Sequence, residues 1–109
     1  MWTERAVRLL EMIHIAIEEG AVAGELLELD AQVTDCNAAL FDVAHEFHGC
    51  ISGCHEVLRR QGLLAGTWCL DPAEGLSPRQ AEELTRVARD YPHLVDDAFV
   101  AQHRDRWLA

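Results

Sequence analysis

The stretch GELLELDAQVTDCNAALFDVAHEF, residues 24–47, decides the fold class of this chain. Its apolar residues recur at alternating spacings of three and four, at Leu26, Leu29, Val33, Cys36, Leu40, Val43 and Phe47. This spacing places side chains on one face of a helix and approaches the heptad seam of packed helices. Acidic residues occupy the other faces, as is typical of a solvated surface, at Glu25, Glu28, Asp35 and Asp42. The pattern predicts one long amphipathic helix over residues 24–47.

Residues 4–19, upstream of this stretch, are predicted to form a second amphipathic helix. Thr3 is a suitable N-cap and Gly20 a suitable stop. One face carries a regular apolar stripe of Ala6, Leu9, Leu10, Ile13, Ala16 and Ile17. The apolar surface extends beyond that stripe at Val7, Met12 and Ile15. A helix that is apolar on more than one side needs more packing partners than a small bundle easily supplies.

Three shorter helices are predicted downstream. Residues 50–61 form the first, and Gly62 suits the left-handed position that ends it. Ser77-Pro78-Arg79-Gln80 has the pattern of a capping box, with serine as N-cap, proline at the first helical position and glutamine three residues after the cap. The helix that it starts is predicted to run to Asp90, before Tyr91-Pro92. A short last helix is predicted over residues 96–107.

No alternating strand pattern of useful length occurs, so we expect an all-α fold of four to five helices in a bundle-like arrangement. The chain is expected to form a single helical domain over residues 1–109. Within it we expect a long, helical, hairpin-like part over 1–64, an irregular connector over 65–76 and C-terminal helices over 77–109. Gly66, Pro72 and Gly75 break the pattern in the connector.

Charge and composition exclude several classes of function. The chain has 109 residues, of which 19 are acidic and nine are basic, and its net charge is −10. Such a protein repels phosphate backbones and anionic lipid, so we expect neither nucleic acid nor a membrane as a partner. All nine basic residues are arginine. Without lysine, no side chain can form a Schiff base with a carbonyl substrate, and a Walker-type phosphate loop is excluded.

The chain is expected to be cytoplasmic. No segment approaches the roughly 18 apolar residues that a membrane span requires. Four cysteines are present, and they are Cys36, Cys50, Cys54 and Cys69. In a cytoplasmic protein they would be reduced thiols that pack as small hydrophobic residues.

The stretch HEFHGCISGCHEVL, residues 45–58, raises the question of a metal site. His45 with His48, and Cys50 with Cys54, could each share a helical face, and Gly49 could let the chain bend between the two pairs. However, cysteines separated by three residues on a helix are less specific for zinc than the usual C-x2-C turn. Cys54 also continues an apolar stripe made of Ile51, Cys54, Val57 and Leu58. The sequence therefore favours packing cysteines over metal ligands.

Catalytic alternatives have less support. A Cys–His pair is conceivable because Cys50 would lie near a helix N-terminus, but nothing resembles a nucleophile turn or an oxyanion loop. Adjacent carboxylates occur at Glu18/Glu19, Glu82/Glu83 and Asp96/Asp97. Neighbouring residues on a helix point about 100° apart, so we expect these pairs to be solvated or capping groups.

The chain from Asp35 onward resembles the C-terminal end of a bacterial branch of the dihydrodipicolinate synthase / N-acetylneuraminate lyase family. The most specific segments are HEVLRRQGLL at 55–64, WCLDP at 68–72, LSP at 76–78 and YPHL at 91–94. Before Asp35 no specific motif matches the family. The match there is limited to helix type, since the first helix and the start of the second suit helices that follow the last barrel strand.

The resemblance implies a (β/α)8 barrel followed by a helical C-terminal region, and class I aldolase-type chemistry. In that family a strand lysine forms a Schiff base with pyruvate or a related 2-oxo acid, and a tyrosine relays protons. None of these elements can be placed here, because the chain has no lysine and its one tyrosine, Tyr91, lies in the tail motif. The chain begins at Met1 within what would be the last barrel helices, and we expect a truncated or separately encoded tail. Cys54 stands where the family is expected to have an apolar residue.

The leading hypothesis is a helical C-terminal segment of a lyase of this family, without activity of its own, that packs against a barrel-containing polypeptide or an oligomer partner. The alternative is a stand-alone helical interaction module that forms a homodimer. A weaker alternative is a small metal-binding bundle that uses His45, His48, Cys50 and Cys54. We assign no catalytic, cofactor-binding or metal-binding residue and expect no cofactor.

Overall fold

Five α-helices connected by turns and loops make up the computed structural model, which describes residues 2–109. The helices are α1 (Thr3–Glu19), α2 (Gly24–Phe41), α3 (Cys50–Arg60), α4 (Gln80–Asp90) and α5 (Asp97–Trp107). Two short 3-10 turns, η1 (Val43–His45) and η2 (Pro92–Leu94), follow α2 and α4. The described residues contain no strand, and the predicted all-α fold is confirmed.

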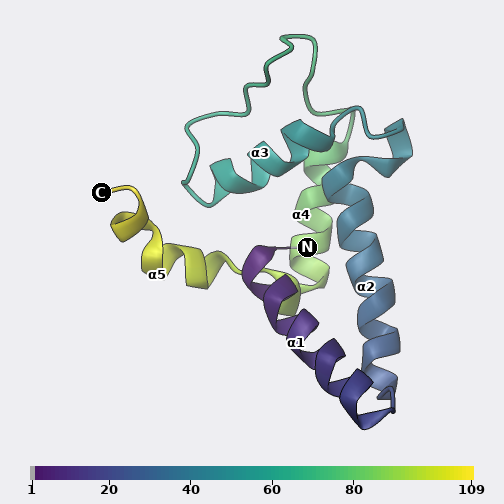
Figure 1. The fold of residues 1–109 in the computed structure, drawn as a ribbon. Coiled ribbons are helices and arrows are strands. Elements are labelled where there is room, and N and C mark those ends of the chain that lie inside the picture. Colours follow the sequence, from purple (N-terminus) through teal and green to yellow (C-terminus); the bar gives the residue numbers. More distant parts are fainter. Residues whose placement is uncertain (1) are drawn as a thin grey trace.

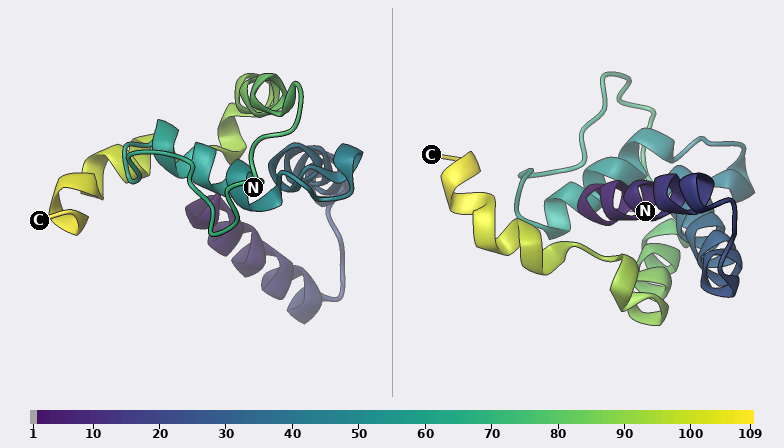
Figure 2. Two further views of the ribbon diagram at one scale, coloured as in Figure 1. Left: turned by 90° about the horizontal axis from the view of Figure 1, so that it is seen from above. Right: turned by 60° about the horizontal axis from the view of Figure 1, so that its bottom comes forward.

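The core lies where α2, α3 and α4 pack against one another, while α1 and α5 diverge from this body as two arms (Figure 1). Its buried residues include Cys36, Leu40, Leu84, Val87 and Leu94. Trp2, just before α1, is also part of this cluster. No residue of α1 itself is buried. The left view in Figure 2 shows α1 extending from the body, and both views show α5 projecting away from α2, α3 and α4.

Two helix ends follow the glycine pattern that the sequence predicts. Gly20 and Gly62 both adopt left-handed backbone angles, with φ of 67° and 75°. At each end the glycine N–H and the following N–H donate to carbonyls of the last helical turn, for example Leu63 N to Leu58 O at 2.9 Å. These bonds form the Schellman pattern, in which two otherwise unpaired carbonyls are satisfied.

The prediction that one helix spans residues 24–47 is wrong, because α2 ends at Phe41. Asp42 follows it in the left-handed region, with φ of 58°, and the chain turns through η1 toward α3. The turn places Val43 and Phe47 at the surface, although the apolar spacing assigned them to the core. Aspartate tolerates this backbone conformation better than most residues, and the contacts of its carboxylate hold the turn in place.

The predicted start of α4 is also displaced, because the helix begins at Gln80 rather than directly after Ser77. Half of the capping box forms: the Gln80 side chain accepts from the Ser77 N–H at 3.0 Å. The other half does not, because the Ser77 hydroxyl donates to the Asp42 carboxylate instead. Arg79 then takes a left-handed conformation with φ of 68°.

The prediction that Thr3 caps the first helix is wrong as well. Thr3 is the first helical residue, and no side chain from the local sequence caps this end. Instead, the Glu4 N–H donates to Asp96 Oδ2, 92 residues away in the chain, at 3.0 Å. The cap of α1 is therefore a tertiary contact that satisfies one of the free amides of the first turn.

Two glycines at the start of α3 have no space for a side chain, one against α2 and the other against Gln80 of α4. A Cβ atom at Gly53 would lie 2.1 Å from the Leu40 carbonyl oxygen, and one at Gly49 would lie 2.0 Å from Gln80 Oε1. The sequence holds the signal for this contact, a small-x-x-x-small spacing in GCISG at 49–53, which the apolar pattern alone does not reveal.

Gly53→Ala should lower the free energy of unfolding by about 2 kcal/mol, because the added methyl group meets backbone that can move only with α2. Urea unfolding followed by far-ultraviolet circular dichroism measures this. Gly24→Ala is the matched control, since nothing lies within 4 Å of a Cβ there. Its stability should stay the same or rise by up to about 1 kcal/mol. Equal losses in the two variants would contradict the tight contact.

Candidate functional site

The histidines and cysteines of residues 45–58 are distributed over a turn and the start of a helix. His45 lies in η1, and its Nδ1 atom is 2.7 Å from Asp42 Oδ1. Cys50 and Cys54 begin α3, and Cys54 packs against the hydrophobic core. Within residues 2–109, no three histidine, cysteine or acidic side chains come together in a group that could hold a metal ion.

Cys36, Cys50, Cys54 and Cys69 form no disulfide with one another. Burial raises the pKa of the Cys36 and Cys54 thiols. A raised pKa keeps a thiol protonated at neutral pH and lowers its reactivity as a nucleophile or metal ligand. Cys69 Sγ lies 3.2 Å from the Ser52 hydroxyl oxygen and attaches the connector to α3.

Asp42 joins three segments that are separate in the sequence. Its side chain accepts from the Gly49 N–H at 2.8 Å and from the Ser77 hydroxyl, and it contacts His45 Nδ1. Burial by itself would raise the pKa of Asp42, but the bonds from Ser77, His45 and Gly49 outweigh it, and the pKa is lowered. The residue is 3% exposed, so its assignment to a solvated face is wrong.

The Asp42 cluster contains serine, histidine and aspartate but not the order that catalysis needs. In a hydrolytic triad the histidine lies between the serine and the aspartate, so that it can take the serine proton. Here the carboxylate lies between Ser77 and His45 and binds both. The arrangement positions backbone, and it does not activate the Ser77 hydroxyl.

Gln80 satisfies backbone groups at the same junction. Its amide donates to Gly49 O at 2.9 Å and lies 3.4 Å from the Ala39 and Leu40 carbonyl oxygens at the end of α2. The sequence pattern predicts the position of Gln80 in the capping box, but it does not predict the contact of this side chain with α2. The helix-end carbonyls of α2 therefore find their partner on α4, in a buried site where unpaired carbonyls would be costly.

Two other acidic residues join helices rather than facing solvent. Asp35 accepts two bonds from Arg86 and one from the Tyr91 hydroxyl, each at 2.8 Å. The Arg86 bonds, helped by Tyr91 and opposed by burial, lower the pKa of Asp35 to about 2. Its prediction as a solvated residue is wrong. Asp96 is 5% exposed and accepts from Glu4 N–H and from Gln61 Nε2, which connects α1 to the end of α3.

Of the three carboxylate pairs, only Asp96/Asp97 includes a buried member, and it acts as a cap. Glu83 pairs with Arg86, and Glu18 and Glu19 are exposed at the end of α1. The pairs therefore behave as the capping or solvated groups that the sequence predicts.

The buried carboxylate of Glu56 forms an ionic cluster on α3 with two partly exposed arginines. Arg59 donates two bonds to its carboxylate at 2.7 and 2.9 Å, and Arg60 donates one at 2.8 Å. Arg60 also reaches α4, where it donates to Thr85 Oγ1 and Ala81 O. The Arg59 bonds lower the pKa of Glu56 to about 2, with a further contribution from Arg60 and opposition from burial.

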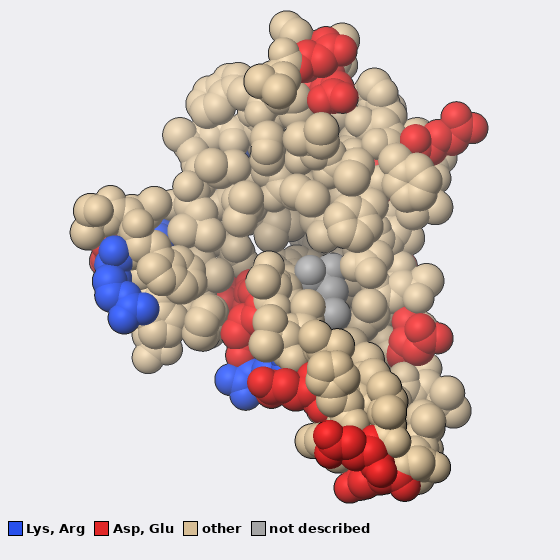
Figure 3. Space-filling model, viewed as in Figure 1, with Lys and Arg blue, Asp and Glu red and all other residues tan. Residues whose placement is uncertain are grey.

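The feature that distinguishes the surface is exposed apolar area on α1. Ile17 is 70% exposed, and the same helix exposes Val7, Leu10, Ile13 and Ile15. Figure 3 shows carboxylates gathered along this arm, with few arginines near them. Exposed apolar area of this extent is unusual on an isolated small protein and is typical of interaction surfaces.

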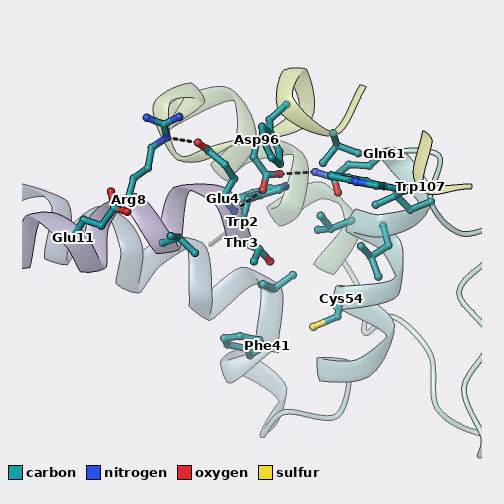
Figure 4. A pocket seen from close by; sticks show the side chains of 17 residues that line it. Trp2, Thr3, Glu4, Arg8, Glu11, Phe41, Cys54, Gln61, Asp96 and Trp107 are labelled. Atoms are coloured by element: carbon teal, nitrogen blue, oxygen red, sulfur yellow. Dashed lines mark hydrogen bonds and ion pairs between the residues drawn. The ribbon is translucent and has the colours of Figure 1, made fainter. Parts of the chain in front are cut away.

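A groove of about 900 Å³ lies beside this arm, bordered by α1, α2, α3 and α5 (Figure 4). Trp2 and Leu40 line it from the core side, and Phe99 and Trp107 line it from α5. The apolar arm and this groove together form the candidate interaction surface.

The chain matches no protein-family model, no curated protein and no solved structure. No helix within residues 2–109 combines the length and apolar character needed to cross a membrane.

Asp42→Ala should lower the free energy of unfolding by about 2–4 kcal/mol, because it leaves the buried Gly49 N–H without an acceptor and places alanine in a left-handed conformation. Asp42→Asn keeps one acceptor oxygen and the tolerance for that conformation, and it should cost about half as much. Chemical denaturation measures both. The matched control is Asp30→Ala, an exposed site within α2, where a comparable loss would contradict the role given to Asp42.

Glu56→Gln should lower the free energy of unfolding at pH 7, because the charged bonds to Arg59 and Arg60 are lost. The loss should be only about 1–2 kcal/mol, because both arginines are partly solvated. Because the folded-state pKa is depressed to about 2, the carboxylate stabilises the fold above its unfolded pKa near 4.5. That contribution is lost as the pH falls from 4.5 toward 2. The wild type should therefore lose more stability over this range than Glu56→Gln. Glu82→Gln, at an exposed site, should keep the wild-type pH dependence.

Proposed function

We propose that this chain is a helical packing segment of a dihydrodipicolinate synthase / N-acetylneuraminate lyase-like protein, without catalytic capacity of its own, that lies against a (β/α)8 barrel. The observation that supports it best is that α1 buries none of its residues although it carries a full apolar stripe. The outer helices of such a barrel bury a stripe of this kind against the strands.

The composition of the chain agrees with a packing role. Schiff-base chemistry requires a lysine, and the sequence has none. In the proposed arrangement the barrel supplies the lysine and the substrate site, while α1 covers the barrel and α2, α3 and α4 form a self-supporting body behind it. The tail motifs HEVLRRQGLL and WCLDP support the choice of family.

The barrel could be encoded in the same gene as this chain or by a separate gene. The DNA sequence upstream of the Met1 codon distinguishes these two cases. We expect it to encode a barrel with a strand lysine, in frame or one frameshift away. If no such barrel is encoded there and none associates with the chain, the exposed stripe of α1 would favour the homodimeric module instead.

Leu10→Glu should affect stability differently in the chain alone and in a protein that contains the barrel. In the chain alone both Leu10 and Ile15 are exposed, so Leu10→Glu and Ile15→Glu should each change stability by less than about 0.5 kcal/mol. With the barrel present, Leu10→Glu should cost about 2–4 kcal/mol, because a carboxylate is forced into an apolar contact. Ile15 lies on the other side of α1, so Ile15→Glu should remain mild. Thermal unfolding of both proteins measures this, and equal effects with the barrel would contradict the proposed packing face.

A further inference from the structure

The groove beside α1 uses a different face of this helix from the apolar stripe. Glu4, Val7 and Glu11 line the groove at spacings of three and four, which place them on one side of a helix. Leu10, Ile13 and Ile17 do not line it. An occupant of the groove is therefore separate from the barrel proposed to lie on the stripe of α1.

The groove is a preformed aromatic site. Trp2, Phe41, Phe99 and Trp107 all contribute to its lining. On α5 the rings of Phe99, His103 and Trp107 contact one another. Their centroid distances are 4.6 Å for Phe99–His103, 5.5 Å for His103–Trp107 and 5.9 Å for Phe99–Trp107, and this cluster holds the aromatic side chains along the groove. Rigid aromatic residues of this kind carry much of the binding energy in protein interfaces, and their faces also attract cations.

The rim of the groove is negatively charged. Of the described residues that line it, Glu4, Glu11 and Asp96 carry carboxylates, and Arg8 carries the one guanidinium. Arg8 is bound to Glu4, and Asp96 is bound to the Glu4 N–H and to Gln61 (Figure 4). Glu11 is exposed at the open end. The charge left over at the rim is therefore negative and favours a cationic occupant.

The walls of the groove are helices, and the part of α1 from Thr3 to Glu11 gives it a length of about 12 Å. A helix of two to three turns matches this length, and its apolar residues at i, i+3 and i+7 can fill an aromatic-lined groove. A second copy of this chain is a poor occupant, because α1 carries Glu4, Glu11 and Glu18 at seven-residue intervals and each copy has a net charge of −10.

We propose that this groove binds an amphipathic helix from a basic protein partner, with the apolar face of that helix on Trp2, Phe99 and Trp107 and its lysine or arginine side chains beside Glu11. The acidic flank of α1 selects the charge of the partner, and the aromatic residues supply the contact area.

The test uses the full chain with Trp68→Phe, which removes an exposed tryptophan outside the groove, so that fluorescence reports mainly on Trp2 and Trp107. The probes are two 14-residue amphipathic peptides, one of leucine and lysine and one of leucine and glutamate. The leucine–lysine peptide should change the tryptophan fluorescence in a saturable way, and the leucine–glutamate peptide should not.

Glu11→Gln should weaken binding of the leucine–lysine peptide about fivefold. Glu19→Gln is the matched control, because it removes the same charge from the same helix outside the groove, and it should change the affinity less than twofold. Trp107→Ala should weaken binding about tenfold, as truncation of an aromatic contact does.

Three results would overturn the assignment. Equal effects of Glu11→Gln and Glu19→Gln would show non-specific attraction to an acidic protein. Equal binding of both peptides would remove the charge selection. Sedimentation showing a peptide-free dimer that Trp107→Ala dissociates would place a second copy in the groove. None of these outcomes depends on whether a barrel lies on the stripe of α1, so the two proposals can fail separately.

Discussion

The close contact between α3 and the end of α2 organises the three-helix core. Gly53 lies so near the Leu40 carbonyl that a methyl group has no room, and Gly49 is equally close to the side chain of Gln80. This approach lets one glutamine amide reach carbonyls on both sides of the α2–α3 turn. Because Gln80 starts α4, the same contact sets where the third helix of the core begins.

Aspartates hold the parts of the chain that apolar packing does not. Asp42 fixes the turn after α2 to the segment before α4, and Asp35 joins α2 to Arg86 of α4 and to Tyr91. Asp96 caps α1 from the far end of the chain. Each carboxylate is paired with donors, so its burial is compensated by charge-assisted bonds. The body is therefore self-supporting, while α1 and α5 are attached near their first residues and leave apolar surface open.

This division between body and arms favours a role in binding other proteins over a role in catalysis. The carboxylates of Asp35, Asp42 and Asp96 are each paired with donors, and the serine and histidine of the Asp42 cluster are used for positioning. The arms, in contrast, expose a stripe on α1 and border an aromatic groove with an acidic rim. A barrel on the stripe and a basic helix in the groove would cover different faces of the same arm.

The all-α class, the positions of most helices and the two helix ends at Gly20 and Gly62 follow from the sequence, because helical periodicity and left-handed glycine are local properties. The broad apolar surface of α1 is also evident from the sequence. Tertiary contacts, in contrast, make α2 stop at Phe41 and α4 start at Gln80, and they bury or partly bury Asp35, Asp42 and Asp96. Each of these depends on a partner 35 or more residues away, such as Ser77 for Asp42 and Glu4 for Asp96. A contact at that separation leaves no periodic trace in the sequence, and it overrides local helix preference where it satisfies a buried polar group.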